Sequence, residues 1–285
     1  MRSTLMLKTL AGGPAVLVST VLTCMVGALL PAPAGLALFV VGLVIAGVLA
    51  MGRLEPQVLR VWFSARPPAE GEAVVLAPVV TLLRQHGIGP PTVALYVRDR
   101  EGVGVWAAGR RGVVVSTGLV CAVQLHQLGS EEAAALMAHT QGLLQVGRPR
   151  FDLLIEFWTL PWQVLVGAAT AVGRGFAVLP LVEFAWKIRF VVATVAVVQS
   201  VADHRAASGV VIAVFIALTY LVPRWRRAWL QRVDAAADSF VVEYGLGAAW
   251  AALLGRQSTS PAMLARIDRI TGPTKHSALT LVQAR

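Results

Sequence analysis

Charged residues are scarce in this chain. Only 14% of its 285 residues are Asp, Glu, Lys or Arg, while 56% are hydrophobic, and the mean hydropathy is +0.70. An ordinary soluble domain carries about 25% charged residues. The deficit excludes a wholly soluble protein of usual composition and indicates membrane segments, with length left for one modest soluble domain.

Cysteine is also scarce, which bears on the compartment. Cys24 lies in an apolar run, Cys121 lies outside the apolar runs, and the two form no Cys-x-x-Cys pair. Two such cysteines exclude a framework of disulfides and favour a reducing compartment.

Acidic residues are outnumbered by basic ones, which gives a net charge of +10. Such a charge fits either a nucleic-acid-binding protein or the cytoplasmic flanks of membrane spans. The distribution favours the flanks, because basic residues gather just outside the apolar runs: Arg2, Lys8, Arg53, Arg60, Arg66, Arg148, Arg150, Arg224, Arg226, Arg227 and Arg232. We therefore expect the lipid bilayer as a partner and no nucleic acid.

Two apolar runs open the chain, over residues 14–31 and 34–52. Each is close to the ~20 residues that cross the hydrocarbon core of a bilayer. A second span follows the first directly, unlike the polar sequence that follows a cleaved signal peptide. The uncharged turn between them predicts a transmembrane hairpin with both ends on the cytoplasmic side.

The less apolar parts of the chain predict a small α+β domain. Alternating and β-branched residues indicate three strands, and helical periodicity with acidic first turns indicates four helices. In the second helix Ser130 is the expected N-cap. The strands are expected over residues 92–97, 103–108 and 112–117, and the helices over 75–87, 130–146, 228–256 and 260–271.

A long apolar insert separates the two parts of this domain. It contains three segments, 153–173, 176–202 and 207–223. An even number of crossings is required if both parts lie on one side of the membrane. The charges of the middle segment favour 153–173 and 207–223 as the spans. A short hairpin of 188–203 with 207–223 is the alternative, with 153–173 at the interface and His204 in a turn.

Four sequence blocks resemble, in order, those of the HtpX-like membrane zinc metallopeptidases. They are Trp106–Leu119, Ser130–Leu143, Arg232–Asp238 and Ser260–Ile267. They are similar to the family patterns N-A-F/W-A-x-G with v-v-v-t-x-G-L, A-H-E-x-G-H, R-x-x-E-x-x-A-D, and H-P-x-x-x-x-R-I. The resemblance implies a zincin-like domain, zinc as cofactor, and cleavage of damaged membrane proteins in quality control.

The metal-binding block departs from the family pattern. In H-E-x-x-H, two histidines four residues apart bind zinc, and the glutamate accepts a proton from the zinc-bound water. Here His139 matches the first histidine, while Thr140 stands at the position of the base and Leu143 at the second histidine. Asp234 replaces the third ligand, usually Glu, and Asp238 matches an aspartate that supports the ligands.

These departures predict little zinc and little peptide hydrolysis. General-base catalysis alone contributes about 10²–10⁴-fold in rate, and the loss even of a partner that only supports a ligand costs about 10–100-fold. His126, one loop before His139, is the candidate substitute ligand. Otherwise His139 is expected to be a structural polar residue that hydrogen-bonds to Asp234 or Asp238.

The sequence therefore predicts a mainly α-helical membrane protein with transmembrane hairpins and a small α+β, zincin-like domain on the cytoplasmic side of the plasma membrane. The expected parts are the hairpin (1–52), the first part of the domain (53–150), the apolar insert (151–223) and the second part of the domain (224–285). We expect an inactive relative of the family that binds membrane-protein segments or a partner protease along an edge strand at Val105, Trp106 and Ala107. Two alternatives stay open: an active zinc endopeptidase with a non-standard site of His139, Asp234 and His126, and a membrane scaffold component.

Overall fold

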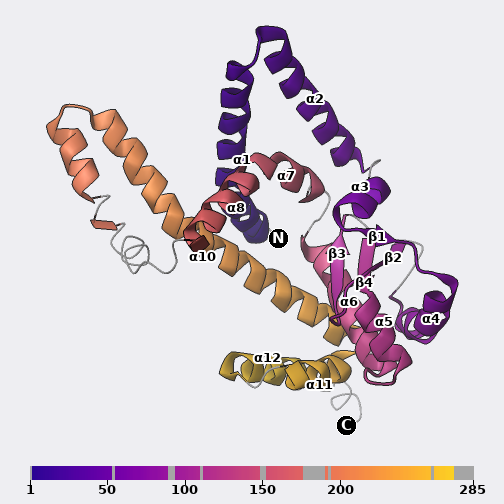
Figure 1. Ribbon diagram of the computed structural model, residues 1–285. Coiled ribbons are helices and arrows are strands. Elements are labelled where there is room, and N and C mark those ends of the chain that lie inside the picture. Colours follow the sequence, from indigo (N-terminus) through magenta and orange to yellow (C-terminus); the bar gives the residue numbers. More distant parts are fainter. Residues whose placement is uncertain are drawn as a thin grey trace. The chain divides into compact units, whose positions relative to one another are not determined.

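The computed structural model in Figure 1 is mostly helical and carries one small sheet. It describes residues 2–52, 55–88, 94–109, 112–147, 152–175, 190–191, 194–257 and 260–272. The chain divides into two compact units. The apolar unit comprises residues 1–47 and 153–232, and the sheet unit comprises residues 48–152 and 233–285.

Two long helices, α1 (Arg2–Leu29) and α2 (Ala32–Met51), confirm the two helices of the predicted N-terminal hairpin. In the turn between them, the N–H of Ala34 donates to the carbonyl of Pro31 at 2.8 Å. A Cβ on Gly35 would lie 2.3 Å from the carbonyl oxygen of Gly27, so the helices approach closely only because this position has no side chain. Among the described residues, three helices are long and apolar enough to cross a membrane: Met6–Leu29, Ala32–Met51 and Ala206–Glu243.

The apolar segment 153–173, which was predicted to span the membrane, is divided into two helices. The structure has α7 (Asp152–Trp158) and α8 (Leu160–Gly175), which are separated at Thr159. Pro161 lacks the N–H that would continue the ladder and breaks the helix. The next amide, the N–H of Trp162, donates instead to the hydroxyl of Ser19 on α1 at 3.2 Å.

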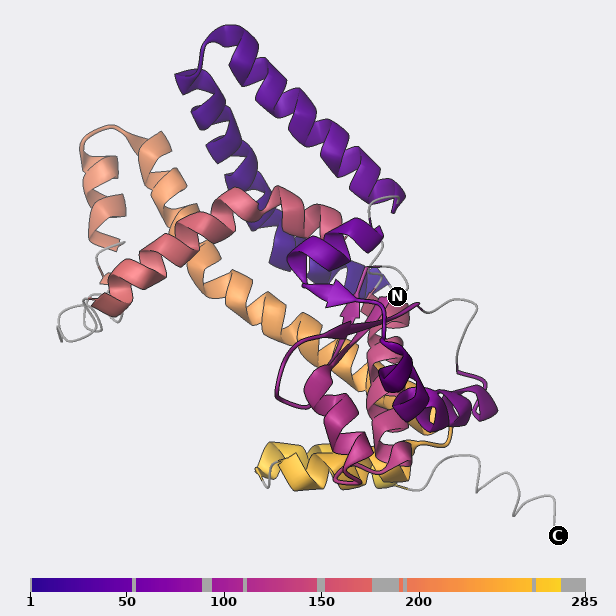
Figure 2. The same cartoon turned by 45° about the vertical axis from the view of Figure 1, so that its right-hand side comes forward.

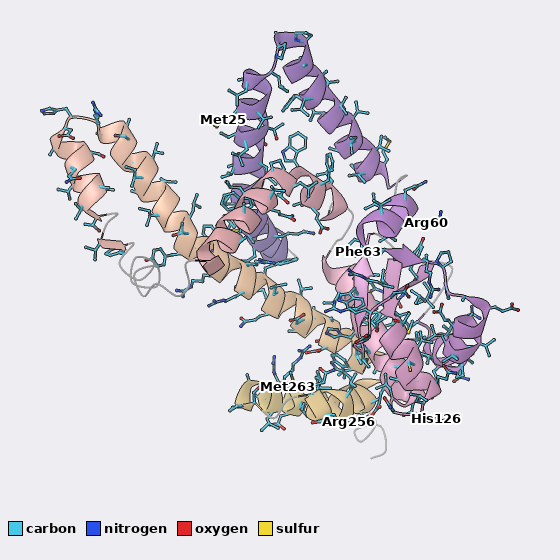
Figure 3. The ribbon with its side chains drawn as sticks, viewed as in Figure 1. Met25, Arg60, Phe63, His126, Arg256 and Met263 are labelled. Atoms are coloured by element: carbon cyan, nitrogen blue, oxygen red, sulfur yellow. The ribbon has the colours of Figure 1, made fainter. Side chains whose placement is uncertain are left out.

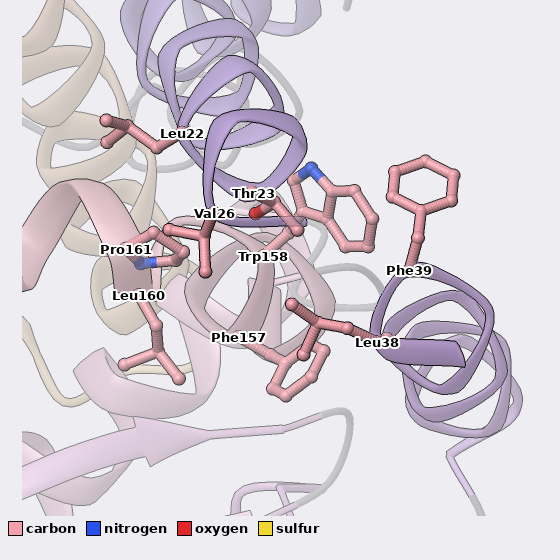
Figure 4. A pocket seen from close by; sticks show the side chains of 10 residues that line it. Leu22, Thr23, Val26, Leu38, Phe39, Phe157, Trp158, Leu160 and Pro161 are labelled. Atoms are coloured by element: carbon pink, nitrogen blue, oxygen red, sulfur yellow. The ribbon is translucent and has the colours of Figure 1, made fainter. Parts of the chain in front are cut away.

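This break, the Pro161 elbow, is fixed against α1 by a second hydrogen bond. The indole N–H of Trp158 donates to the Thr20 hydroxyl at 2.9 Å, and the same ring packs edge-on against Phe39 of α2. Figure 4 shows the apolar pocket lined by this part of the unit. Side chains at the elbow thus satisfy polar backbone groups among apolar helices, as a low-dielectric setting demands.

The helix that contains the last apolar segment, 207–223, extends well beyond that segment. Residues 194–202 are helical, and His204, with φ of 58°, lies in the turn before α10 (Ala206–Glu243), as expected for that histidine. The helix α10 is 38 residues long and continues through Pro223 without a break. Of the predicted middle segment, 176–202, residues 176–189 lie outside the described residues.

The predicted helix over 228–256 is two helices. The helix α10 ends at Glu243, and α11 (Gly247–Gln257) follows. Gly245 has φ of 78°, and the N–H of Leu246 donates to the carbonyl of Val241 at 3.0 Å. These features are those of a glycine-terminated helix, so the glycine sets the boundary that periodicity alone did not indicate.

The sheet has four strands, in the order β1-β2-β4-β3. Only β2 and β4 are parallel, and the other pairs are antiparallel. Three of the strands confirm the predicted ones, apart from residues 92 and 93, which lie outside the described residues, and β1 was not predicted. The strands are β1 (Ala65–Arg66), β2 (Ala94–Arg98), β3 (Val105–Ala108) and β4 (Gly112–Ser116).

Five other helices belong to the sheet unit. They are α3 (Glu55–Trp62), α4 (Glu70–Gln85), α5 (Thr117–Gln124), α6 (Ser130–Gly147) and α12 (Pro261–Thr271). Figures 1 and 2 show α11 and α12 side by side. The core joins residues of β4, α6 and α11, including Val115, Ala134, Ala138, Ala251 and Leu254.

The start of one helix and the N-cap of another differ from the predictions for electrostatic reasons. The helix α4 begins at Glu70 rather than at residue 75, because the carboxylate of Glu72 accepts the N–H of Ala69 at 2.7 Å. Ser130 is the first residue of α6 and not its N-cap. The N–H of Gly129 donates to the carboxylate of Glu132 at 3.1 Å, so a side chain from inside the helix serves as the cap.

Stability should depend on pH through Glu72. Hydrogen bonds from Arg66 lower the pKa of Glu72, burial opposes them, and the N–H of Ala69 lowers the pKa further. The net pKa is below its ordinary value, so this stabilisation is present above the unfolded-state pKa of ~4.3 and is lost as the pH falls through the folded value. Since Arg66 is partly exposed, Glu72→Gln should lower the free energy of unfolding at pH 7 by only about 0.5–1 kcal/mol.

The measurement is thermal unfolding of the detergent-solubilised chain at neutral pH and near pH 3, with Glu70→Gln as the control. The effect of Glu72→Gln should shrink in acid. An equal effect at both pH values would contradict the assignment.

Candidate functional site

The candidate site lies inside the sheet unit, where α6, the end of α10, α11 and α12 meet. His139 on α6 and Asp238 on α10 are both buried, with 8% and 7% of their surfaces exposed. The Nε2 atom of His139 lies 3.3 Å from Oδ1 of Asp238. Of the two hydrogen-bond partners expected for His139, the structure therefore has Asp238.

Arg266 of α12 completes this pair. Its Nε donates to Oδ2 of Asp238 and its Nη2 to Oδ1, both at 2.7 Å. The same Nη2 lies 3.3 Å from Nε2 of His139. The guanidinium thus binds the carboxylate with two parallel hydrogen bonds, the strongest geometry for such a pair, and also contacts the imidazole.

Trp250 of α11 is the fourth member of this cluster. Its indole N–H donates to Oδ1 of Asp238 at 2.9 Å. Its ring stacks on the His139 ring with centroids 4.5 Å apart and planes 23° apart, and the Arg266 guanidinium lies 5.8 Å from its centroid. His139, Asp238, Trp250 and Arg266 are called the polar cluster below.

The electrostatics of the polar cluster favour the ion pair. The hydrogen bond to Asp238 raises the pKa of the Arg266 guanidinium, burial partly offsets that rise, and the charges of Asp238 and Asp234 raise it further. Arg266 is therefore a fixed cation within a largely buried site. The proton of His139 decides its role: with a proton on Nε2 the ring donates to Asp238, and without one Nε2 accepts from Arg266.

Asp234, the predicted third ligand, lies one turn before Asp238 on α10 and is half-buried. Its charge acts on Arg266. The carboxylate that accepts hydrogen bonds from Arg266, Trp250 and His139 is that of Asp238 instead.

Thr140 and Leu143 have ordinary roles on α6. The Thr140 hydroxyl is buried and donates to the carbonyl of Leu136 at 3.0 Å. This local bond occupies the O–H at the position where the family has its general base. Leu143 is half-buried and offers no donor to a metal.

His126 is not brought to His139. It is exposed in the turn between α5 and α6, with φ of 55°, as Figure 3 shows. Between Ser130 and His139 the helix rises about 14 Å, at ~1.5 Å per residue.

The donor set of the polar cluster does not fit a zinc ion. In the part of the chain that the structure describes, no three His, Cys, Asp or Glu side chains gather closely enough to hold a metal. Both oxygens of Asp238 accept hydrogen bonds from Arg266, and Nε2 of His139 faces Asp238 and Arg266. A zinc ion requires about four donors in a tetrahedron, so these two residues alone would leave it incomplete.

The predicted edge strand is present as β3, at one end of the sheet and packed against α6. Val105, Trp106 and Ala107 are half-buried. The Trp106 ring lies under the guanidinium of Arg100, whose Cζ is 5.3 Å from its centroid, and it packs against Leu59 and Val114. Trp106 therefore anchors β3 to the sheet, and the outer backbone edge of β3 has no strand beside it among the described residues.

Gly142 allows the helices of the polar cluster to approach one another. A Cβ on Gly142 would lie 3.0 Å from Cα of Ala237 and 3.1 Å from Cβ of Phe240. Any side chain there would push α10 from α6 and separate Asp238 from His139.

Some members of the polar cluster carried a sequence signal and one did not. Arg266 belongs to the Ser260–Ile267 block, so its position could have been suspected. Trp250 lies in no block, and its hydrogen bond to Asp238 depends on the reversal at Gly245 that brings α11 back beside α10.

Arg266→Gln should destabilise the chain strongly. The change leaves the buried Asp238 carboxylate without its cation, which costs about 3–5 kcal/mol for a buried pair. Arg266→Lys retains the charge but not the planar fork, so its loss of unfolding free energy should lie between those of Arg266→Gln and of the native chain. Unfolding by denaturant in detergent measures these losses, with the exposed Arg269→Gln as the control. Equal losses for Arg266→Gln and Arg269→Gln would show that the ion pair is unimportant.

Gly142→Ala should destabilise although alanine favours helices. The added methyl group overpacks the α6–α10 contact, at a cost of about 1–3 kcal/mol. Gly71→Ala on α4 is the matched control, because a Cβ there meets nothing within 4 Å and alanine should gain up to ~1 kcal/mol. Thermal unfolding of both variants gives the comparison, and a shift in the same direction for both would refute the close-packing argument.

No protein-family model matches this chain, and no curated protein matches it either. The function proposed below is therefore argued from residues and geometry.

Proposed function

We propose that this chain is a non-catalytic relative of the HtpX-like membrane metallopeptidases that binds membrane-protein segments or a partner protease. The observation that carries the proposal is the bidentate ion pair of Arg266 with Asp238, both in contact with His139. The guanidinium of Arg266 contacts the imidazole of His139, the residue that would bind zinc in the family pattern.

The relation to the family is supported by which residues come together. His139, Asp238 and Arg266 come from three different blocks of the sequence, on α6, α10 and α12, and they form one cluster. Gly142, the glycine of the A-H-E-x-G-H pattern, lies on α6 where a Cβ would meet Ala237 and Phe240 of α10. The strand of the Trp106 block packs against α6.

The absence of catalysis is supported by the chemistry of the positions. The general base is replaced by Thr140, whose hydroxyl donates to a backbone carbonyl. General-base catalysis is worth about 10²–10⁴-fold, and the second histidine is replaced by Leu143. With both of its oxygens bound to Arg266, the Asp238 carboxylate is not free to activate water.

Binding is proposed to use the outer edge of β3. A peptide in extended form adds to such an edge through backbone hydrogen bonds, and affinity then requires no catalytic group. The edge strand is short, with four residues, and is held rigidly by Trp106. A scaffold that retains the edge while losing the metal ligands suits a protein that holds segments without cutting them.

The location is proposed from the charge pattern. Basic residues follow α2 and the apolar half of α10. This pattern favours the cytoplasmic side for these helix ends and for the sheet unit. The membrane is proposed to be the plasma membrane.

Zinc analysis of the purified full chain tests this proposal. The native chain should contain far less than about one zinc per chain and show no chelator-sensitive cleavage of casein. The variant Thr140→Glu/Leu143→His/Asp234→Glu restores the family's donors and should gain zinc if the scaffold is zincin-like. About one tightly held zinc in the native chain would overturn the inactive assignment. A restored variant that folds but takes up no zinc would overturn the family assignment.

A further inference from the structure

Four arginines on α10 have no role in the proposed site. Arg224, Arg226, Arg227 and Arg232 are all exposed and lie in the apolar unit, directly after the apolar residues 206–223. We call them the arginine collar. From Ala206 to Val233 the sequence contains no Asp or Glu, so the first acid of this helix, Asp234, comes after the last arginine of the collar.

The arginine collar surrounds the helix rather than forming a stripe. At ~100° per residue, the four side chains point to different sides of α10. Along the axis they occupy only about 12 Å, at ~1.5 Å per residue. A flat partner such as a nucleic-acid duplex or a protein surface would meet only one side. A layer that surrounds the helix would meet all four arginines at once.

Two tryptophans lie at the same level of α10 as the arginine collar. Trp225 and Trp229 are half-buried between the arginines, and the ammonium of Lys8 on α1 lies 5.8 Å from the Trp229 ring centroid. Tryptophan at the end of an apolar span is typical of the interface between hydrocarbon and headgroups. Lys8 brings a further positive charge to this level of the apolar unit.

The other end of the same apolar segment is different. The turn before α10 carries Asp203, His204 and Arg205, so its fixed charges nearly cancel. All the excess positive charge of the segment lies at the collar. Such a juxtamembrane basic cluster is attracted to anionic lipid headgroups, by about 1 kcal/mol per Lys or Arg.

We propose that the arginine collar binds the phosphate groups of anionic phospholipids that surround α10 where it leaves the hydrocarbon core. Guanidinium groups suit this ligand, because their planar fork binds phosphate oxygens in pairs. The proposal does not depend on the function of the sheet unit.

Energy transfer from tryptophan to dansyl-labelled lipid tests this proposal on the full chain in neutral detergent. Dansyl-phosphatidylglycerol should bind at least about tenfold more tightly than dansyl-phosphatidylcholine at low salt, because only the former carries net charge. In Arg224→Gln/Arg226→Gln/Arg227→Gln, three arginines at ~1 kcal/mol each predict up to about 100-fold weaker binding. The variant with Lys at the same three positions should retain most of the affinity.

The matched control is Arg84→Gln/Arg205→Gln/Arg269→Gln, which removes the same charge from three exposed positions outside the collar. It should bind dansyl-phosphatidylglycerol as the native chain does. Equal affinity for the two lipids, or an equal loss in the control, would overturn the proposal. Displacement of the lipid by polyuridylic acid would point to nucleic acid instead, and displacement by inorganic phosphate to a free-phosphate site. Either result would also overturn it.

Discussion

The carboxylate of Asp238 holds together the helical half of the sheet unit. It lies on α10 and accepts hydrogen bonds from Trp250 of α11 and Arg266 of α12, and it contacts His139 of α6. A buried charge is tolerated only when donors surround it. The three partners come from three other helices, so this one side chain links four helices. Gly142 contributes by allowing α10 to lie close enough to α6.

The same arrangement supports the proposal that the site is structural and not catalytic. A hydrolytic centre needs groups whose lone pairs or protons are available to a metal, water or substrate. Here the hydrogen-bonding capacity of Asp238 is used by neighbouring side chains, and the Thr140 hydroxyl by a backbone carbonyl.

Much of the fold could be predicted from the sequence, because local signals were strong. The apolar runs predicted α1 and α2, β-branched residues predicted β4, and the position of His204 in a turn followed from the charges around it. The errors arose where one residue overrides the pattern. Pro161 divided a predicted span, Gly245 divided a predicted helix, and Glu72 extended α4 toward the N-terminus.

The candidate site was less predictable. His139 and Asp238 could be named from their spacing, but the stacking of Trp250 and the fork of Arg266 depend on helices that are distant in the chain. No local pattern indicates which of two acids one turn apart faces inward. Asp238 accepts the hydrogen bonds of the polar cluster, whereas Asp234 acts on Arg266 only through its charge.

The Pro161 elbow also has a consequence for biosynthesis. The amide of Trp162, left without a helical acceptor, finds one in Ser19, a residue of α1 that is 143 positions earlier. Synthesis runs from the N-terminus, so the acceptor leaves the ribosome long before the donor. The later segment therefore completes its backbone hydrogen bonding only by docking onto a helix that already exists, which fixes the order in which these two pieces of the protein assemble.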